Sequence, residues 1–302
     1  MSLLNMKPNR FLLSCFAFFL CLTMAFAQGT PSQDTEEETL DFESLLVAIK
    51  QTDTPLKSGE GVVVHISGEP PLNIDPRIVT LRIVFDSENT RFDSPRRTTI
   101  LTPTTMWEIV RRNGKPDYYF STKPQSYHEH MDPRRFLTWV DKGLATYLRE
   151  NNFHIIGREV FNGTLCYVLE AKQEDRSKRI WIAPERGFRH LKYEIQQPTP
   201  VDALDSDIPM EALTVFRTTI TYQQHGEIWF PKAVFIEYAW LDFKPADPII
   251  SQRMLKIKNF KLNHDLPPET FTVDLPEDAM IKVDGISKAL TKQEFLKRYG
   301  QL

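Results

Sequence analysis

The segment His128-Glu129-His130 is the strongest candidate for a metal site in this sequence. On a β-strand, positions 128 and 130 point to the same face, so two imidazoles could bind one ion. A closed site needs further ligands, and no third ligand stands at a recognisable spacing from this pair. We therefore favour the alternative, a solvated loop that precedes a helix over 132–150, and we expect no metal.

The other reactive side chains do not form a known catalytic motif. Cys166 lies in the apolar segment Leu165–Leu169, which is typical of a buried thiol that behaves as a small apolar side chain. The sequence has no Gly-x-Ser-x-Gly motif and no glycine-rich phosphate loop, the signatures of serine hydrolases and of nucleotide binding. We therefore expect neither an enzyme nor a cofactor, and we keep a hydrolase with an unrecognised site as an alternative.

Aromatic side chains recur on the predicted strands, and they allow two interpretations. They form the ordinary core of a sheet, or they line an apolar cavity between a curved sheet and helices, as in many sites for apolar ligands. A filled core and a hollow one give the same pattern, so both interpretations stay open. For a hollow core, the residues that we expect to bind the ligand are Trp181, Phe188, Tyr193, Phe216, Tyr222, Trp229, Phe235 and Tyr238.

Alternation of apolar and polar residues predicts that most of the chain forms half-buried antiparallel strands. Asn113-Gly114 and Asn162-Gly163 are typical of two-residue hairpin turns, because both central residues of such a turn need a positive φ. Further turns are predicted at 185–187 and 225–226. The predicted strands are 62–67, 79–85, 106–112, 118–121, 155–161, 165–171, 180–183, 188–195, 215–223, 228–230, 234–240 and 254–262.

The expected fold class is mainly β (α+β). A set of about ten or eleven strands must curl, close or stack in order to bury one face, and we predict a curved antiparallel sheet that forms an open β-barrel, with helices covering an apolar cavity. A β-sandwich is the alternative. Helices are predicted over 40–51, 132–150 and 291–299. The segments 197–211 and 242–248 are rich in proline and aspartate and are predicted to be surface loops at the rim of a binding site.

The N-terminal segment has the layout of a secretory signal peptide. Lys7 and Arg10 precede an apolar run from Phe11 to Ala25, and Ala27 completes a small-residue cleavage site. The run is about 15 residues long, shorter than the roughly 20 that a membrane-spanning helix needs. We therefore expect residues 1–27 to be removed after Ala27, and not to remain as an anchor.

Cleavage at this point leaves a mildly acidic protein with a single cysteine. Loss of Lys7 and Arg10 takes the formal net charge from −3 to −5, which argues against nucleic acid as a partner. Residues 28–39 are predicted to be a disordered acidic lead-in, and residues 40–302 to form a single domain with a core of its own. No intramolecular disulfide is expected, so packing must hold the fold.

Four segments, in this order along the chain, resemble a known family. They are Gly157–Glu170, Arg179–Phe188 with its Trp-Ile-Ala-Pro sequence, Ile228–Lys232 with its Trp-Phe-Pro sequence, and Leu266–Val273. The succession resembles the bacterial outer-membrane lipoprotein-sorting family, with the LolA/LolB-like fold, although Ala183 stands where the family often has Asp. The resemblance implies an open barrel with a helical lid over an apolar cavity. In members of known role it implies the carriage or receipt of lipoprotein acyl chains.

The export signal, the aromatic sheet and this resemblance together favour a soluble carrier in the periplasm. We expect a monomer that binds lipid or the acyl chains of lipoproteins for transfer to the outer membrane, under a lid formed by helices 40–51 and 132–150. A membrane transporter or receptor is the expected further partner. The alternative hypothesis is an envelope sensor or interaction module on the same fold, which docks through the loops 197–211 and 242–248.

Overall fold

The computed structural model describes residues 40–52, 56–68, 76–126, 128–138, 143–198, 213–241 and 249–300. The predicted signal peptide and acidic lead-in lie outside these residues, as do the whole of loop 242–248 and most of loop 197–211. Gln197 and Pro198 are described, and they belong to a strand and not to a loop.

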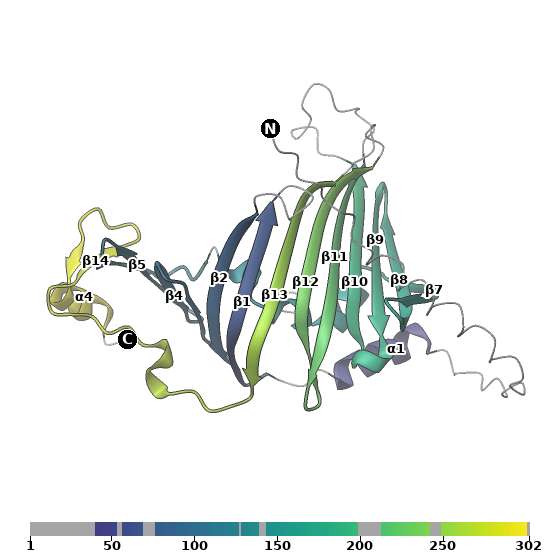
Figure 1. Ribbon diagram of the computed structural model, residues 1–302, viewed down its shortest axis with the longest axis horizontal. Helices are drawn as coiled ribbons and strands as arrows, with labels where there is room; N and C mark the ends of the chain where they lie inside the picture. Colours follow the sequence, from purple (N-terminus) through teal and green to yellow (C-terminus); the bar gives the residue numbers. More distant parts are fainter. Residues whose placement is uncertain are drawn as a thin grey trace, which may run out of the picture. The chain divides into compact units, whose positions relative to one another are not determined.

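One sheet contains all fifteen strands that the structure describes, and Figure 1 shows β7 to β13 beside β1 and β2. The order across the sheet is β15-β14-β6-β5-β4-β3-β2-β1-β13-β12-β11-β10-β9-β8-β7. The strands are β1 (Ser58–Gly68), β2 (Arg77–Asp86), β3 (Thr90–Asp93), β4 (Arg97–Leu101), β5 (Met106–Arg112), β6 (Lys115–Ser121), β7 (His154–Phe161), β8 (Thr164–Gln173), β9 (Arg176–Ala183), β10 (Arg189–Pro198), β11 (Leu213–His225), β12 (Ile228–Leu241), β13 (Ile249–Leu262), β14 (Met280–Val283) and β15 (Leu290–Thr291).

Two pairings between distant parts of the chain set this order. β1 pairs antiparallel with β13, so that Val63 lies opposite Ile257. β14 pairs with β6 in parallel, so that Ile281 lies opposite Tyr118; the other neighbours are antiparallel. Because β7 and β15 stand at opposite ends of the order, the sheet is not closed. The prediction of a mainly β fold built on one open sheet is confirmed.

The predicted count of ten or eleven strands is wrong, because four short strands lack a clear apolar alternation. β3 and β4 bury Thr90, Thr98 and Thr99, where the sequence pattern calls for apolar residues. β14 and β15 have only four and two residues. In addition, the predicted strands 228–230 and 234–240 are one strand, β12, which continues through Pro231 at a register shift, a position at which a sheet tolerates proline.

The two predicted Asn-Gly hairpins are confirmed. Asn113 and Gly114 have φ values of 50° and 78°, and Asn162 and Gly163 have values of 49° and 77°. Both central residues of each turn are therefore in the left-handed region, as the twist of a two-residue hairpin requires.

The first and last predicted helices are confirmed. α1 (Phe42–Gln51) begins after Asp41, whose carboxylate accepts a hydrogen bond from the backbone N–H of Ser44 at 2.7 Å. α4 (Lys292–Tyr299) begins with a capping box between Thr291 and Glu294, which satisfies two N–H groups at the start of the helix.

The predicted helix over 132–150 is not continuous. Its described residues form α2 (Arg135–Thr138) and α3 (Leu144–Glu150), preceded by the 3₁₀ turn η1 (Glu129–Met131). Gly143, the residue before α3, has a φ of 76°, a conformation that a right-handed helix cannot contain. The apolar spacing that predicted one helix is shared by two short ones. Across the described ranges, no helix is both long and apolar enough to span a bilayer.

The main core lies where α2 and η1 meet the central strands. Two glycines of β1 make its packing close: a Cβ at Gly61 would lie 2.2 Å from the Phe260 ring, and one at Gly59 would lie 2.6 Å from the Phe85 ring. The buried residues of this core are Val63, Leu81, Ile83, Phe85, Phe92, Met131, Leu137, Ile220, Phe230, Val234, Leu255, Ile257 and Phe260.

Two smaller cores lie elsewhere in the sheet. One joins α4 and β14 to β4–β6 and contains Phe295, whose ring is 5.1 Å from that of Trp107 and 5.0 Å from that of Phe120. The other joins β8, β9 and β10 and contains Cys166 and Trp181.

Candidate functional site

An apolar cavity of about 280 Å³ lies between α2 and the strands β10, β11 and β12. Its walls are mainly carbon, and it is partly open to solvent. The residues that line it are His130, Arg135, Phe136, His190, Tyr193, Phe216, Thr218 and Ile236.

The register of β10, β11 and β12 determines which side chains form the floor of this cavity. Tyr193 lies opposite Thr218, and Thr218 lies opposite Ile236, so these three side chains form a row across three strands. Phe216 is two residues from Thr218 and therefore points to the same face. Phe136 of α2 forms the opposite wall, while the neighbouring Leu137 is 4% exposed and packs in the main core.

The Tyr222 hydroxyl ties α2 to the sheet. It lies 3.1 Å from the carbonyl oxygen of Phe136 and 3.1 Å from that of His190. Burial raises the pKa of Tyr222, so the hydroxyl keeps its proton and donates to these acceptors at neutral pH. The helix wall and the sheet floor of the cavity are thus joined by one side chain.

A second tyrosine contact holds α3. The hydroxyls of Tyr147 and Tyr193 are 2.9 Å apart, and burial, followed by this hydrogen bond, raises the pKa of Tyr193. α3 in turn lies against α1, and Arg149 forms an ion pair with Glu43 across them. α1 itself contributes no residue to the lining of the cavity.

Among the titratable residues that line the cavity, the charge of His190 and Arg135 at neutral pH can be assigned. His190 is 2% exposed, and burial lowers its pKa to about 3, so its ring is neutral. Arg135 lies at the margin, with 46% of its side chain exposed and its guanidinium 4.0 Å from Glu129. The cavity therefore has a mainly apolar lining, with a neutral His190 inside it and a cation, Arg135, at its edge.

Four of the predicted ligand-binding residues are in or beside this cavity. Tyr193 and Phe216 line it. Tyr238 lies opposite Phe216 with a ring separation of 5.0 Å, and Tyr222 makes the hydrogen bonds to the two walls.

The other four lie elsewhere. Trp181 packs in the small core with Cys166, and its indole N–H donates to Glu159. Phe235 lies between Ile236 and Val234 on β12 and so points to the opposite face of the sheet. Trp229 lies under Arg186, 4.5 Å from the ring centroid, and Phe188 occupies the turn before β10 with a φ of 53°.

Several lining residues were not predicted. His190, Arg135 and Thr218 are not among the aromatic strand residues from which the ligand-binding set is predicted. The alternation on β10 to β12 could have indicated Ile236 and Thr218, because they share a face with Tyr193 and Phe216. Which part of that face α2 covers depends on packing between distant segments, and the sequence pattern does not contain it.

The two histidines of the candidate metal motif do not share a face. His128 precedes η1 and its ring lies 6.1 Å from that of Phe92, whereas His130 lies within η1 and packs edge-on against His65 at 5.5 Å. No three His, Cys, Asp or Glu side chains within the described ranges are grouped so as to hold a metal ion.

Cys166 is fully buried in the structure. Burial raises its pKa to about 11, so the side chain is a thiol and not a thiolate at neutral pH. Since the thiolate is the reactive form, Cys166 has a packing role in the β8–β10 core.

Solved structures similar to this chain include members of the family that the sequence resembles. A LolA superfamily protein from Nitrosomonas europaea is 15% identical, with 78% of this chain and 99% of that chain covered and a TM-score of 0.43. A putative outer membrane lipoprotein-sorting protein domain from Vibrio parahaemolyticus is 13% identical over 77% and 96% of the two chains, with a TM-score of 0.40. The lipoprotein LppX from Mycobacterium tuberculosis is 11% identical over 74% and 98%, with a TM-score of 0.28. No family model and no curated protein matches the chain.

Proposed function

We propose that this chain binds the acyl chain of a lipid or lipoprotein in the cavity between α2 and β10–β12. The observation that carries the proposal is the composition of that cavity: its lining is mainly apolar, His190 is neutral, and Arg135 lies at the margin. An acyl chain with a polar end matches this distribution, because its methylenes leave water while the polar end stays at the edge.

The size of the cavity agrees with binding of part of an acyl chain. Its volume of about 280 Å³ is near the lower end of the roughly 300–1,000 Å³ of small-molecule sites. Each methylene that moves from water into such a cavity contributes about 0.8 kcal/mol. A longer chain needs more room, which displacement of α2 would supply.

The contacts that hold α2 and α3 suit a lid that opens. The Tyr222 hydroxyl joins α2 to the sheet, and the Tyr147–Tyr193 pair joins α3 to β10. A hydrogen bond of this kind contributes a net of about 1 kcal/mol, so the bonds are strong enough to favour the closed form and weak enough to break when a ligand binds.

In this proposal the protein is a soluble periplasmic carrier that delivers its cargo to the outer membrane. The signal-peptide pattern of residues 1–27 supports export. Delivery requires a membrane transporter or receptor as donor or acceptor, and the protein would act as a monomer so that the cavity mouth is accessible to both.

A pair of adjacent substitutions tests the binding site. Ile236→Trp fills the cavity, so we expect the dissociation constant of a fluorescent fatty-acid probe to rise by about tenfold or more, the equivalent of 1.4 kcal/mol. Phe235→Trp is the matched control, because it places the same indole on the same strand but on the opposite face.

The same measurements on the two variants and the wild type also distinguish the carrier hypothesis from the interaction module. Equal probe binding by the two variants and the wild type would show that the cavity is not the site. Absence of probe binding by the wild type would remove the carrier hypothesis and leave the interaction module, whose predicted docking loops lie largely outside the described residues.

A further inference from the structure

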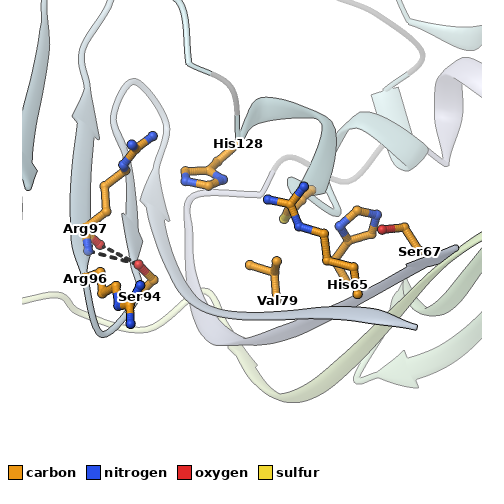
Figure 2. A pocket seen from close by; sticks show the side chains of 9 residues that line it. His65, Ser67, Val79, Ser94, Arg96, Arg97 and His128 are labelled. Atoms are coloured by element: carbon orange, nitrogen blue, oxygen red, sulfur yellow. Dashed lines mark hydrogen bonds between the residues drawn. The ribbon is translucent and has the colours of Figure 1, made fainter. Parts of the chain in front are cut away.

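A second cavity, of about 240 Å³, adjoins the apolar one, and Figure 2 shows its lining. The two meet at a pair of histidines: His65 lines the second cavity, His130 lines the first, and their ring centroids are 5.5 Å apart. The second cavity, which we call the basic cavity, is lined by His65, Ser67, Arg77, Val79, Ser94, Arg96, Arg97, His128 and Met131.

The basic cavity concentrates positive charge. Three arginines line it, from β2, from the turn between β3 and β4, and from the start of β4, and the lining contains no carboxylate among the described residues. Arg97 is paired with Glu108 at 2.9 Å, whereas no ion pair within the described ranges involves Arg77 or Arg96. Arginine presents several N–H donors in a planar fork that fits the oxygens of a phosphate group.

His65 gives an independent indication of a ligand. It is 7% exposed, and its Nε2 atom is buried without a hydrogen-bond partner in the part of the chain that the structure describes. A buried polar atom left without a partner is unfavourable, because it has lost its hydrogen bonds to water. A ligand oxygen in the basic cavity would remove that cost. Burial, and then electrostatic interactions with His130, Arg253 and Arg77, lower the pKa of His65 to about 4, which agrees with a site of positive potential.

We propose that the basic cavity binds the phosphate group of the lipid whose acyl chain occupies the apolar cavity, so that the ligand is an anionic phospholipid. The inference rests on the proposed acyl-chain site and adds the headgroup to it. The adjacency of the two cavities at His65 and His130 matches the adjacency of phosphate and acyl chain in one molecule. Arg135, which lines the apolar cavity, adds a further cation to the lining of the two cavities.

The test compares two lipids that differ only in the phosphate. Lysophosphatidic acid and the uncharged monoacylglycerol, each with the same fluorescent acyl chain, are titrated into the wild-type protein. We expect at least about tenfold tighter binding of the phosphate lipid, because hydrogen bonds to a charged group are stronger than those between neutral groups.

The variant Arg77→Gln/Arg96→Gln should lose most of this preference and keep its affinity for monoacylglycerol. Arg112→Gln/Arg176→Gln is the control, because it removes two exposed arginines at hairpin ends outside the basic cavity. Thermal unfolding of both variants shows whether they fold as the wild type does, which we expect because all four side chains are on exposed residues.

The outcomes distinguish failure of the acyl-chain site from failure of the headgroup site. If neither lipid binds, the acyl-chain site itself is refuted. If both bind equally to the wild type, the acyl-chain site stands and the headgroup site is refuted. Inorganic phosphate is titrated alone by calorimetry: binding as tight as that of the phosphate lipid would make the basic cavity a site for free phosphate and would overturn the lipid assignment.

Discussion

At the scale of single residues, Tyr222 holds the cavity together, because its hydroxyl contacts carbonyl oxygens of both α2 and β10. Tyr222→Phe removes the donor and leaves two acceptors without it. We expect the free energy of unfolding to fall by about 1–2 kcal/mol and the fluorescent acyl probe to bind faster, because α2 is released more easily. Urea unfolding and stopped-flow fluorescence measure the two effects.

Tyr119→Phe is the matched control for that change. Tyr119 also uses its hydroxyl in one contact, with the Nζ atom of Lys282 at 3.2 Å, but this contact is exposed. We expect a loss below about 0.5 kcal/mol and no change in probe kinetics. Unchanged kinetics in Tyr222→Phe as well would contradict the role of this hydroxyl in holding α2.

The buried histidines predict how stability depends on pH. Burial is the first cause that lowers the pKa of His65 to about 4 and that of His190 to about 3, against about 6.5 for a histidine in an unfolded chain. Between the folded and the unfolded pKa of each histidine, the unfolded chain binds more protons at that residue than the folded chain does. The free energy of unfolding therefore falls as the pH falls through this range. Above about pH 6.5 both histidines are unprotonated in the folded and in the unfolded chain, so they add no pH dependence to the free energy of unfolding.

The measurement is a series of urea unfolding curves between pH 7.5 and about pH 4. His65→Gln should show a shallower fall than the wild type in this range, because one of the buried histidines that take up a proton on unfolding is gone. Identical slopes for the two proteins would contradict the assignment.

Local chemistry explains which residues the sequence predicts well. Asn113-Gly114 and Asn162-Gly163 form the expected turns because a positive φ is a property of the residues themselves. Cys166 is buried as its apolar neighbours indicate. His128 and His130 diverge because they lie at the start of a 3₁₀ turn and within it, and not on a strand. A strand places residues i and i+2 on the same face, whereas a 3₁₀ turn does not.

At the scale of elements, α4 closes one end of the sheet through a single buried ring. Phe295 is 0% exposed and contacts Trp107, Phe120 and Tyr299. Phe295→Ala should cost about 3–5 kcal/mol and raise hydrogen exchange in α4, β14 and β15.

The same variant should bind the acyl probe as the wild type does, because the cavity lies at β10–β12. Hydrogen exchange followed by mass spectrometry, with a probe titration on the same sample, measures both. If the loss of protection against hydrogen exchange spread to β10–β12, the core around Phe295 would not be independent of the strands that form the cavity.

A helix or strand was predictable from the sequence where one continuous segment contains the pattern that indicates it. The capping box of Thr291 and Glu294 marks the start of α4 as expected. β3 and β4 escaped prediction because buried threonines replace the apolar residues on one face. The break between α2 and α3 at Gly143 escaped because the apolar spacing continues on both sides of it.

At the scale of the whole chain, the candidate site depends on pairings that no local pattern contains. The pairing of β1 with β13 brings His65 and Arg77 to the same face as Ile236 of β12. The apolar floor on β10–β12 was predictable in part, since Tyr193 and Phe216 were expected to line it. The basic cavity was not, because its arginines lie in separate short segments that only the sheet order brings together.

The most direct test of the central claim is native mass spectrometry of the full chain, exported with its own N-terminal segment and purified without detergent. We predict a protein that begins at Gln28 and carries a discrete added mass, which organic extraction recovers as a lipid with a phosphate group. A clean apo mass, together with no uptake of added phospholipid or acylated peptide, would contradict the account and show that the aromatic residues of β10–β12 form a filled core.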